Sequence, residues 1–204
     1  MDAPFDWQEV TILIHELQAK GVSYLMGDEL PLDVDEHEID LVQLLQRLAA
    51  CGYPLVENAI ITLLLLHPEY TPFVMQALQH SERDTAEAIA VVTLATLYLQ
   101  AWWFFRLAFA FGHLPGFPEE PFAFLWEERH LPSPSSGYGR DGLLALQEYQ
   151  QNRYGLPLNF LDDWQNQMNH LLSQEESYHR SLSDGLKNTL KRISLEESSR
   201  RGSE

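Results

Sequence analysis

The sequence predicts an all-α fold, in which about six to eight helices form a bundle around one long buried hydrophobic helix at residues 82–112. Apolar residues recur at intervals of three and four, and no segment alternates with the period of two that strands show. With 45% hydrophobic residues, the chain can build a core. Residues 88–105 carry no charge, so a helix there is apolar on nearly every side, as a central helix must be.

The first helix is predicted after Asp6, a side chain suited to an N-cap, and it ends before Gly21. Its apolar face consists of Trp7, Val10, Ile14 and Leu17. A connector at 22–35 leads to a second helix at 36–50. Together these segments make up an acidic, amphipathic start to the chain.

A third helix is predicted from Pro54, because proline suits the first turn of a helix, and Pro68 ends it. This helix is almost wholly apolar, which favours burial. A short helix at 72–79 follows. Ser81 is then expected to cap the long helix at 82–112.

After Gly112 the composition changes to a Pro/Gly-rich, aromatic loop at 113–140, which holds five of the eleven prolines. A short helix is expected inside it at 122–128. Helices at 141–154 and from Asn159 onward complete the bundle. We expect a single domain at 1–195 and a disordered tail at 196–204, with a sub-division into 1–112 and 141–195, joined by the loop at 113–140, as the alternative.

The chain is strongly acidic, with 30 Asp and Glu against 13 Lys and Arg, for a formal net charge of −17. Such a chain repels phosphate, which argues against binding nucleic acid through a basic groove. It can instead steer a basic protein. The single cysteine, Cys51, excludes an intramolecular disulfide and a cysteine-rich zinc site. With no signal peptide at the start of the sequence, we expect a cytoplasmic protein.

Two Glu-x-x-His pairs, Glu127/His130 and Glu176/His179, have the spacing with which helical bundles present metal ligands. Composition alone predicts roughly 0.75 such pairs by chance. The further carboxylates would have to be Glu87 and Glu148. We therefore expect no metal, no cofactor and no catalytic set, and a metal- or small-ligand-binding helical enzyme remains an alternative.

The segment from Gly137 to Gly142 matches the G-x-G-x-x-G pattern of dinucleotide-binding proteins. That chemistry needs a preceding strand, which aims the turn at the pyrophosphate. A Pro/Ser-rich link precedes the glycines here. We therefore interpret the segment as a turn.

The uncharged segment is also long enough to span a membrane, and a membrane-associated protein anchored through residues 88–111 is a second alternative. Three side chains at helical spacing, Thr93, Thr96 and Gln100, form a polar strip along it. This polar strip suits contact with other helices or a small polar cavity. The amphipathic helices on both sides favour a buried, soluble position.

By elimination, the sequence favours a non-catalytic, acidic protein-binding module that acts as an adaptor, regulator or inhibitor. The expected partner is another protein. A basic partner would be attracted by the acidic surface of this chain. A homo-oligomer is left open. Two segments are candidates for contact with it, an acidic connector and an aromatic loop segment: Asp28, Asp33, Asp35, Glu36, Phe122, Phe124 and Trp126.

Overall fold

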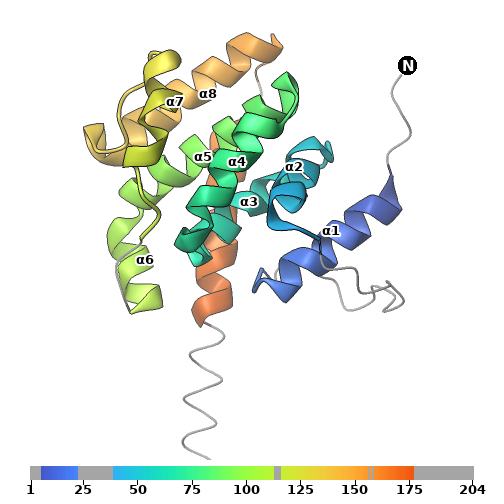
Figure 1. Ribbon diagram of the computed structural model, residues 1–204. Coiled ribbons are helices and arrows are strands. Elements are labelled where there is room, and N and C mark those ends of the chain that lie inside the picture. The colour runs from blue at the N-terminus through green and yellow to red at the C-terminus, as the bar shows by residue number, and fades with distance from the viewer. Residues whose placement is uncertain (1–5, 23–38, 113–115, 156, 158, 177–204) are drawn as a thin grey trace, which may run out of the picture.

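The computed structural model describes residues 6–22, 39–112, 116–155, 157 and 159–176. These residues form nine α-helices and no strand, which confirms the predicted all-α fold. The helices surround one apolar helix, α5, in a single bundle (Figure 1). The buried apolar side chains of the bundle belong to one hydrophobic cluster that extends from Val10 to Leu172.

Four helices make up the first half, and their starts follow from local capping. Their bounds are α1 (Trp7–Ala19), α2 (Leu41–Ala50), α3 (Pro54–Leu66) and α4 (Thr71–His80). The Asp6 carboxylate accepts the N–H groups of Gln8 and Glu9 at 3.0 and 3.2 Å, as predicted for an N-cap. The Asp40 carboxylate caps α2 in the same way, so this helix begins at 41 rather than at 36.

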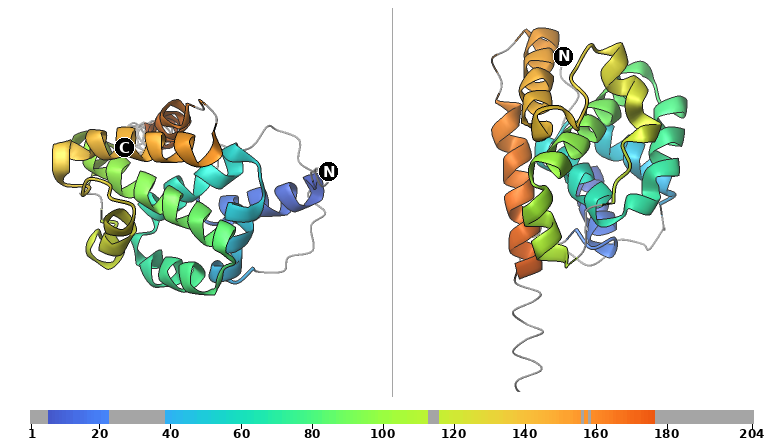
Figure 2. Two further views of the ribbon diagram at one scale, coloured as in Figure 1. Left: turned by 90° about the horizontal axis from the view of Figure 1, so that it is seen from above. Right: turned by 90° about the vertical axis from the view of Figure 1, so that its left-hand side faces the viewer.

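The central helix α5 (Arg83–Trp102) is buried from Ile89 to Gln100. It packs against α2, α3 and α4 on one side and against α8 on the other (Figure 2). The predicted buried axis is therefore confirmed. Its cap differs from the prediction, because Glu82 occupies the N-cap and the Ser81 hydroxyl donates to the Ala77 carbonyl at 2.6 Å instead.

The single helix predicted over 82–112 is divided in two, and this prediction was wrong in its extent. Trp103 leaves the helical region, with φ −99° and ψ 14°, and α6 (Phe104–Phe111) continues in a new direction (Figure 1). No glycine or proline marks the break in the sequence. Gly112, in the left-handed conformation at φ 69°, ends α6 as a C-cap.

The second half wraps over α5 through short elements and then two longer helices. The short ones are the 3-10 turn η2 (Glu120–Phe122), α7 (Ala123–Glu128) and the turn η3 (Ser136–Gly139). They lead to α8 (Arg140–Tyr154) and to a helix at residues 160–176. The Asn159 side chain accepts the N–H of Asp162 at 3.4 Å, as expected of its capping position.

The glycines of the G-x-G-x-x-G segment lie in a turn and at the start of α8, and two of them, Gly139 and Gly142, allow close packing on α5. A Cβ atom on Gly142 would overlap the ring of Tyr98, and one on Gly139 would overlap the Tyr98 carbonyl oxygen. The Tyr98 ring is fully buried, and its hydroxyl donates to the Pro132 carbonyl at 2.7 Å. These glycines thus serve helix packing.

Candidate functional site

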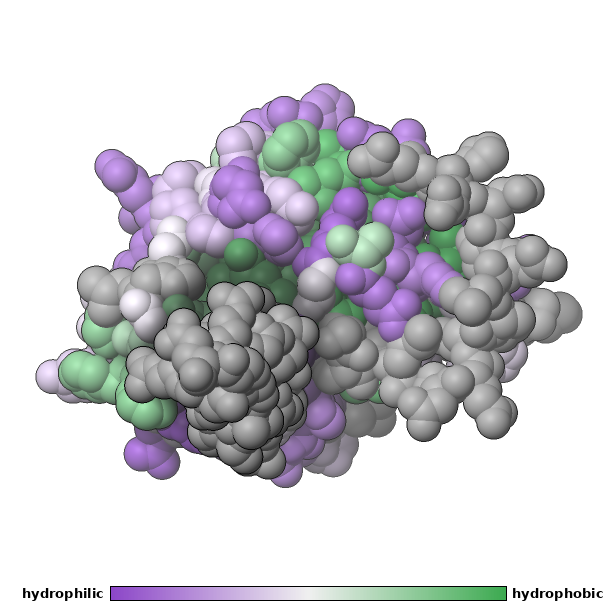
Figure 3. Space-filling view, turned by 90° about the horizontal axis from the view of Figure 1, so that it is seen from below, coloured by the Kyte–Doolittle hydropathy of each residue, from purple (hydrophilic) through white to green (hydrophobic). Residues whose placement is uncertain are grey.

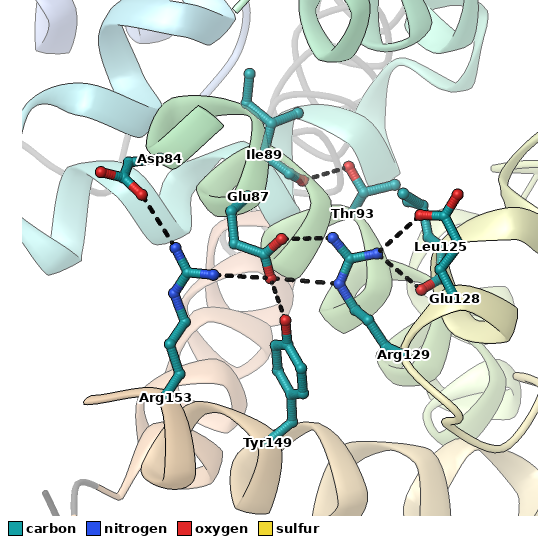
Figure 4. A network of polar contacts seen from close by, with 9 residues as sticks. All are labelled: Asp84, Glu87, Ile89, Thr93, Leu125, Glu128, Arg129, Tyr149 and Arg153. Atoms are coloured by element: carbon teal, nitrogen blue, oxygen red, sulfur yellow. Dashed lines mark hydrogen bonds and ion pairs between the residues drawn. The ribbon is translucent and has the colours of Figure 1, made fainter. Parts of the chain in front are cut away.

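A network of charged side chains joins α5, the end of α7 and α8 (Figure 4). Glu87 of α5 accepts two hydrogen bonds from Arg129, at 2.5 Å from Nη2 to Oε2 and 3.3 Å from Nε to Oε1. Both side chains are largely buried, at 14% and 12% exposed. The pair is a bidentate, charge-assisted contact of the strong kind.

Two side chains of α8 complete this network. The Tyr149 hydroxyl donates to Glu87 Oε1 at 2.8 Å, and Arg153 Nη1 lies 3.7 Å from the same oxygen. Burial alone would raise the pKa of Glu87, but the hydrogen bonds from Arg129 and Tyr149 outweigh it and hold the pKa below its usual value. Glu87 is therefore an ionised carboxylate that fastens three elements together.

The carboxylate proposed as a metal ligand is thus already paired with two basic side chains. His130, in left-handed backbone conformation at φ 55°, and Glu148 are exposed. In the part of the chain that the structure describes, no group of three or more His, Cys, Asp or Glu could hold a metal ion. His179 lies outside the described residues.

The three side chains of the polar strip on α5 form hydrogen bonds with backbone groups. The hydroxyls of Thr93 and Thr96 donate to the carbonyls of Ile89 and Val92, each at 2.7 Å. Gln100 donates to the Phe117 carbonyl at 2.8 Å and accepts the Phe117 N–H at 3.0 Å. These contacts satisfy the buried polar groups and dock the loop after α6 onto α5. A cavity at the polar strip stays a prediction.

The candidate partner-binding residues lie in different settings. The acidic connector, with Asp28, Asp33, Asp35 and Glu36, lies outside the described residues. Phe122 is fully buried and stacks on Phe117, with ring centroids 5.3 Å apart. Phe124 and Trp126 are half-buried against the core. Phe122 could therefore meet a partner only if the loop opened.

An apolar surface that the sequence analysis did not single out lies on α6. Phe105 and Phe109, one helical turn apart, are 84% and 91% exposed, whereas Leu107 and Ala110 on the other side of α6 are buried. In Figure 3, which views the molecule from below, apolar side chains reach the surface at the left, over α6. Two exposed phenylalanines on one turn of a helix are therefore candidates for an interaction surface.

Tyr138 is a further exposed aromatic side chain, outside α6. Its side chain is 84% exposed, and its backbone is left-handed at φ 54°, a conformation that costs a side-chain-bearing residue about 1 kcal/mol. The neighbouring Gly139 packs against Ala101 and Trp102, so Tyr138 lies at the junction of α5 and α6. We call the exposed side chains of Phe105, Phe109 and Tyr138, together with the half-buried Trp102, the aromatic face.

The aromatic face carries positive charge at its edge and no carboxylate along α6. Arg106 is exposed, and its guanidinium lies 4.1 Å from the centroid of the Trp103 ring, a cation–π contact. Between Glu87 and Glu119 the sequence contains no acid at all. Exposed aromatic rings with an adjacent arginine have the composition of binding hot spots.

The chain matches no protein-family model, no curated protein and no solved structure. Among the described residues, α5 is the one helix long and apolar enough to cross a membrane, and 67% of its most apolar window is buried inside the protein. The core helix of a soluble protein meets the same criteria.

Glu57, on the first turn of α3, predicts an unusual dependence of stability on pH. Burial raises the pKa of its carboxyl group to about 7. The folded protein therefore holds a proton that the unfolded chain releases near pH 4.5. Hence the free energy of unfolding should fall as the pH rises from about 4.5 to above 7, by up to about 3 kcal/mol.

Urea unfolding of the wild type and of Glu57→Gln across this pH range measures the effect. The variant should lose most of the slope and be the more stable protein above pH 7. Glu148→Gln, at an exposed carboxyl, is the control and should keep the slope. Equal slopes in the wild type and in Glu57→Gln would show that this carboxyl titrates normally.

Proposed function

We propose that the protein is a non-catalytic protein-binding module, an adaptor, regulator or inhibitor, that contacts its partner through the aromatic face. The observation that carries the proposal is the exposure of Phe105 and Phe109 at 84% and 91% on a helix whose other side is buried. Burial of each phenylalanine by a partner would contribute about 1.5–3 kcal/mol. Left uncovered, such side chains favour aggregation.

The charge of the chain supports a basic partner. A net charge of −17 attracts a basic protein over long range and speeds its association. The acidic connector with Asp33, Asp35 and Glu36 would add to this attraction. Along α6 a partner would cover no carboxylate, so close contact there carries no cost of burying acids.

Two side chains that could suggest catalysis, Cys51 and Glu87, have surroundings that are compatible with a binding role. Burial raises the pKa of the half-buried Cys51 thiol, which makes it a poor nucleophile. A protonated, reduced thiol suits the cytoplasm, where we place the function. Glu87 is engaged by Arg129 and Tyr149.

The double variant Phe105→Asp/Phe109→Asp tests the proposal. It should lose the proteins that co-purify with the wild-type chain from its own cells, because two charges would have to be buried in the complex. Its melting temperature should stay within about 2 °C of the wild type, since both side chains are exposed. Leu144→Asp, at a half-exposed leucine of α8, is the control for a new surface charge. Retention of all partners by the double variant would reject this surface.

Membrane association is the second candidate, favoured by the length and composition of α5. It would require α5 to leave the core, where residues from Ile89 to Gln100 are buried. Extraction of cell membranes with alkaline carbonate separates the two candidates. A chain that stays in the pellet would replace the protein-binding proposal, and a chain released into the supernatant supports it.

A further inference from the structure

We propose that His67 is a pH-sensitive clamp on the end of α1. When the ring is protonated it holds the Lys20 carbonyl, and when the ring is neutral it keeps its one proton for Glu69 and releases Lys20. His67 is the C-cap of α3 and directly precedes the 3-10 turn η1 (Pro68–Tyr70). The clamp concerns α1, so it stands whether or not the aromatic face binds a partner.

Both ring nitrogens of His67 face hydrogen-bond acceptors. Nδ1 lies 2.9 Å from Glu69 Oε1, and Nε2 lies 2.8 Å from the Lys20 carbonyl oxygen. A carboxylate and a carbonyl can only accept, whereas a neutral imidazole donates from only one of its two nitrogens. Both contacts are therefore hydrogen bonds only when the ring carries a proton on each nitrogen.

The groups of α3 and η1 around the ring are compatible with a positive charge. Glu69 is ionised, because hydrogen bonds from its own backbone N–H and from His67 lower its pKa. The Tyr70 ring stacks on the His67 ring, with centroids 4.6 Å apart. Burial and the nearby Glu69 raise the pKa of Tyr70, which leaves this phenol uncharged. The C-terminal end of α3 also favours a cation.

The other elements at this turn add no unpaired cation. On α1, the Lys20 ammonium lies 4.0 Å from Glu16 Oε2, so the two charges offset each other. The helix at 160–176 contributes Gln174, which is uncharged, and carries Glu175 and Glu176 next to it. The charged groups near the ring are thus Glu69, the Lys20–Glu16 pair and these two acids.

Glu69 decides which contact survives when the ring is neutral. A carboxylate is a stronger acceptor than a carbonyl, so it retains the remaining proton on Nδ1. Nε2 then presents a lone pair to the Lys20 carbonyl oxygen, and two acceptors 2.8 Å apart repel each other. Loss of one proton therefore opens the contact with α1 and keeps the contact with Glu69.

The clamp acts where α1 ends. The Lys20 carbonyl is at the C-cap of α1, where carbonyls have no partner within the helix. The next carbonyl, that of Gly21, accepts Gln174 Nε2 at 2.7 Å, a contact that does not depend on protonation. Beyond Val22 the sequence continues into the acidic connector. The state of His67 thus sets how firmly the chain is held where the connector begins.

Nitrogen NMR of the full-length chain with isotope-labelled histidine tests the clamp, because the ring signals show which nitrogen carries a proton. Spectra are recorded from about pH 5 to about pH 8, the range in which histidine rings change charge. The signals of His67 are those that His67→Gln lacks. In the wild type we expect protons on both nitrogens in acid and on Nδ1 alone in the neutral ring.

Glu69→Gln is the decisive variant, at a side chain that is 63% exposed. Without the carboxylate, the neutral ring should carry its proton on Nε2 and keep the Lys20 contact. The new amide can either accept from Nδ1 or donate to it, so both contacts persist at every pH. His80→Gln, at an exposed histidine of α4, is the matched control and should leave the protons of His67 as in the wild type.

Amide hydrogen exchange reads the clamp on the α1 side. The N–H groups of Gly21 and Val22 donate to the carbonyls of Gln18 and Leu17. In the wild type and in His80→Gln, their protection, corrected for intrinsic rates, should fall about tenfold as the ring becomes neutral. In Glu69→Gln it should not fall. All three proteins retain Glu57, so a pH effect from that carboxyl would also appear in Glu69→Gln.

A neutral wild-type ring with its proton on Nε2 would overturn the proposal. A ring with a single proton in acid would overturn it too, because the two contacts could not then both be hydrogen bonds. So would protection of Gly21 and Val22 that stays constant in the wild type, or that falls equally in Glu69→Gln.

Discussion

Arg129→Met is expected to lower the free energy of unfolding by about 3 kcal/mol. The substitution leaves the Glu87 carboxylate largely buried without its bidentate partner, and removal of one member of a buried ion pair typically costs 3–5 kcal/mol. We expect the low end of this range, because Tyr149 and Arg153 still contact the carboxylate. Urea unfolding at neutral pH measures the loss.

The double variant Glu87→Gln/Arg129→Met separates the charge effect from lost packing. It should recover part of the stability, because no uncompensated carboxylate remains. The pKa of Glu87 is lowered in the folded protein, so the stability due to this pair is present above pH 4.5 and is lost as the pH falls. Arg140→Met, at an exposed arginine, should change stability by less than about 0.5 kcal/mol. A similar small loss for Arg129→Met would contradict the role of the network.

Gly142→Ala should destabilise the protein by about 3 kcal/mol, although alanine is the better helix former. The added methyl group would overlap the ring of Tyr98. That ring is fully buried and is held by its hydrogen bond to Pro132, so it cannot move aside without breaking other contacts. Overpacking of this kind costs about 1–3 kcal/mol, and separation of α8 from α5 adds to it.

Gly116→Ala is the matched control for this substitution. Its methyl group would meet only Pro68, at an ordinary contact distance of 3.6 Å. Its stability should stay within about 0.5 kcal/mol of the wild type. If Gly142→Ala is as stable as Gly116→Ala, then α8 does not pack closely on Tyr98.

Much of the fold could be predicted, because the signals are local. Asp6 caps α1, Pro54 begins α3 and the uncharged segment forms the buried α5, as periodicity and capping chemistry predict. The break at Trp103 could not be predicted, since neither glycine nor proline lies there. The prediction that Ser81 caps α5 was wrong, because its hydroxyl donates a hydrogen bond to the Ala77 carbonyl instead.

The candidate site was harder to predict, because it depends on tertiary packing. A helix that is apolar all round does not reveal which of its aromatic side chains the rest of the protein covers. Phe122 is buried and Phe109 is exposed, although both lie in segments of the sequence that are rich in aromatic residues. Arg106 was the available signal, since a charge inside an apolar helix indicates that one side meets solvent. The Glu87–Arg129 pair joins residues that no sequence pattern connects.

Amide hydrogen exchange of the full-length chain, free and in the complex isolated from its own cells, tests the central claim most directly. Binding through the aromatic face predicts slower exchange in the complex along α6 and at Tyr138, because a partner would exclude water and suppress local opening there. Exchange in α1 and α4 should not change. Unaltered exchange along α6, with protection appearing elsewhere, would contradict the claim.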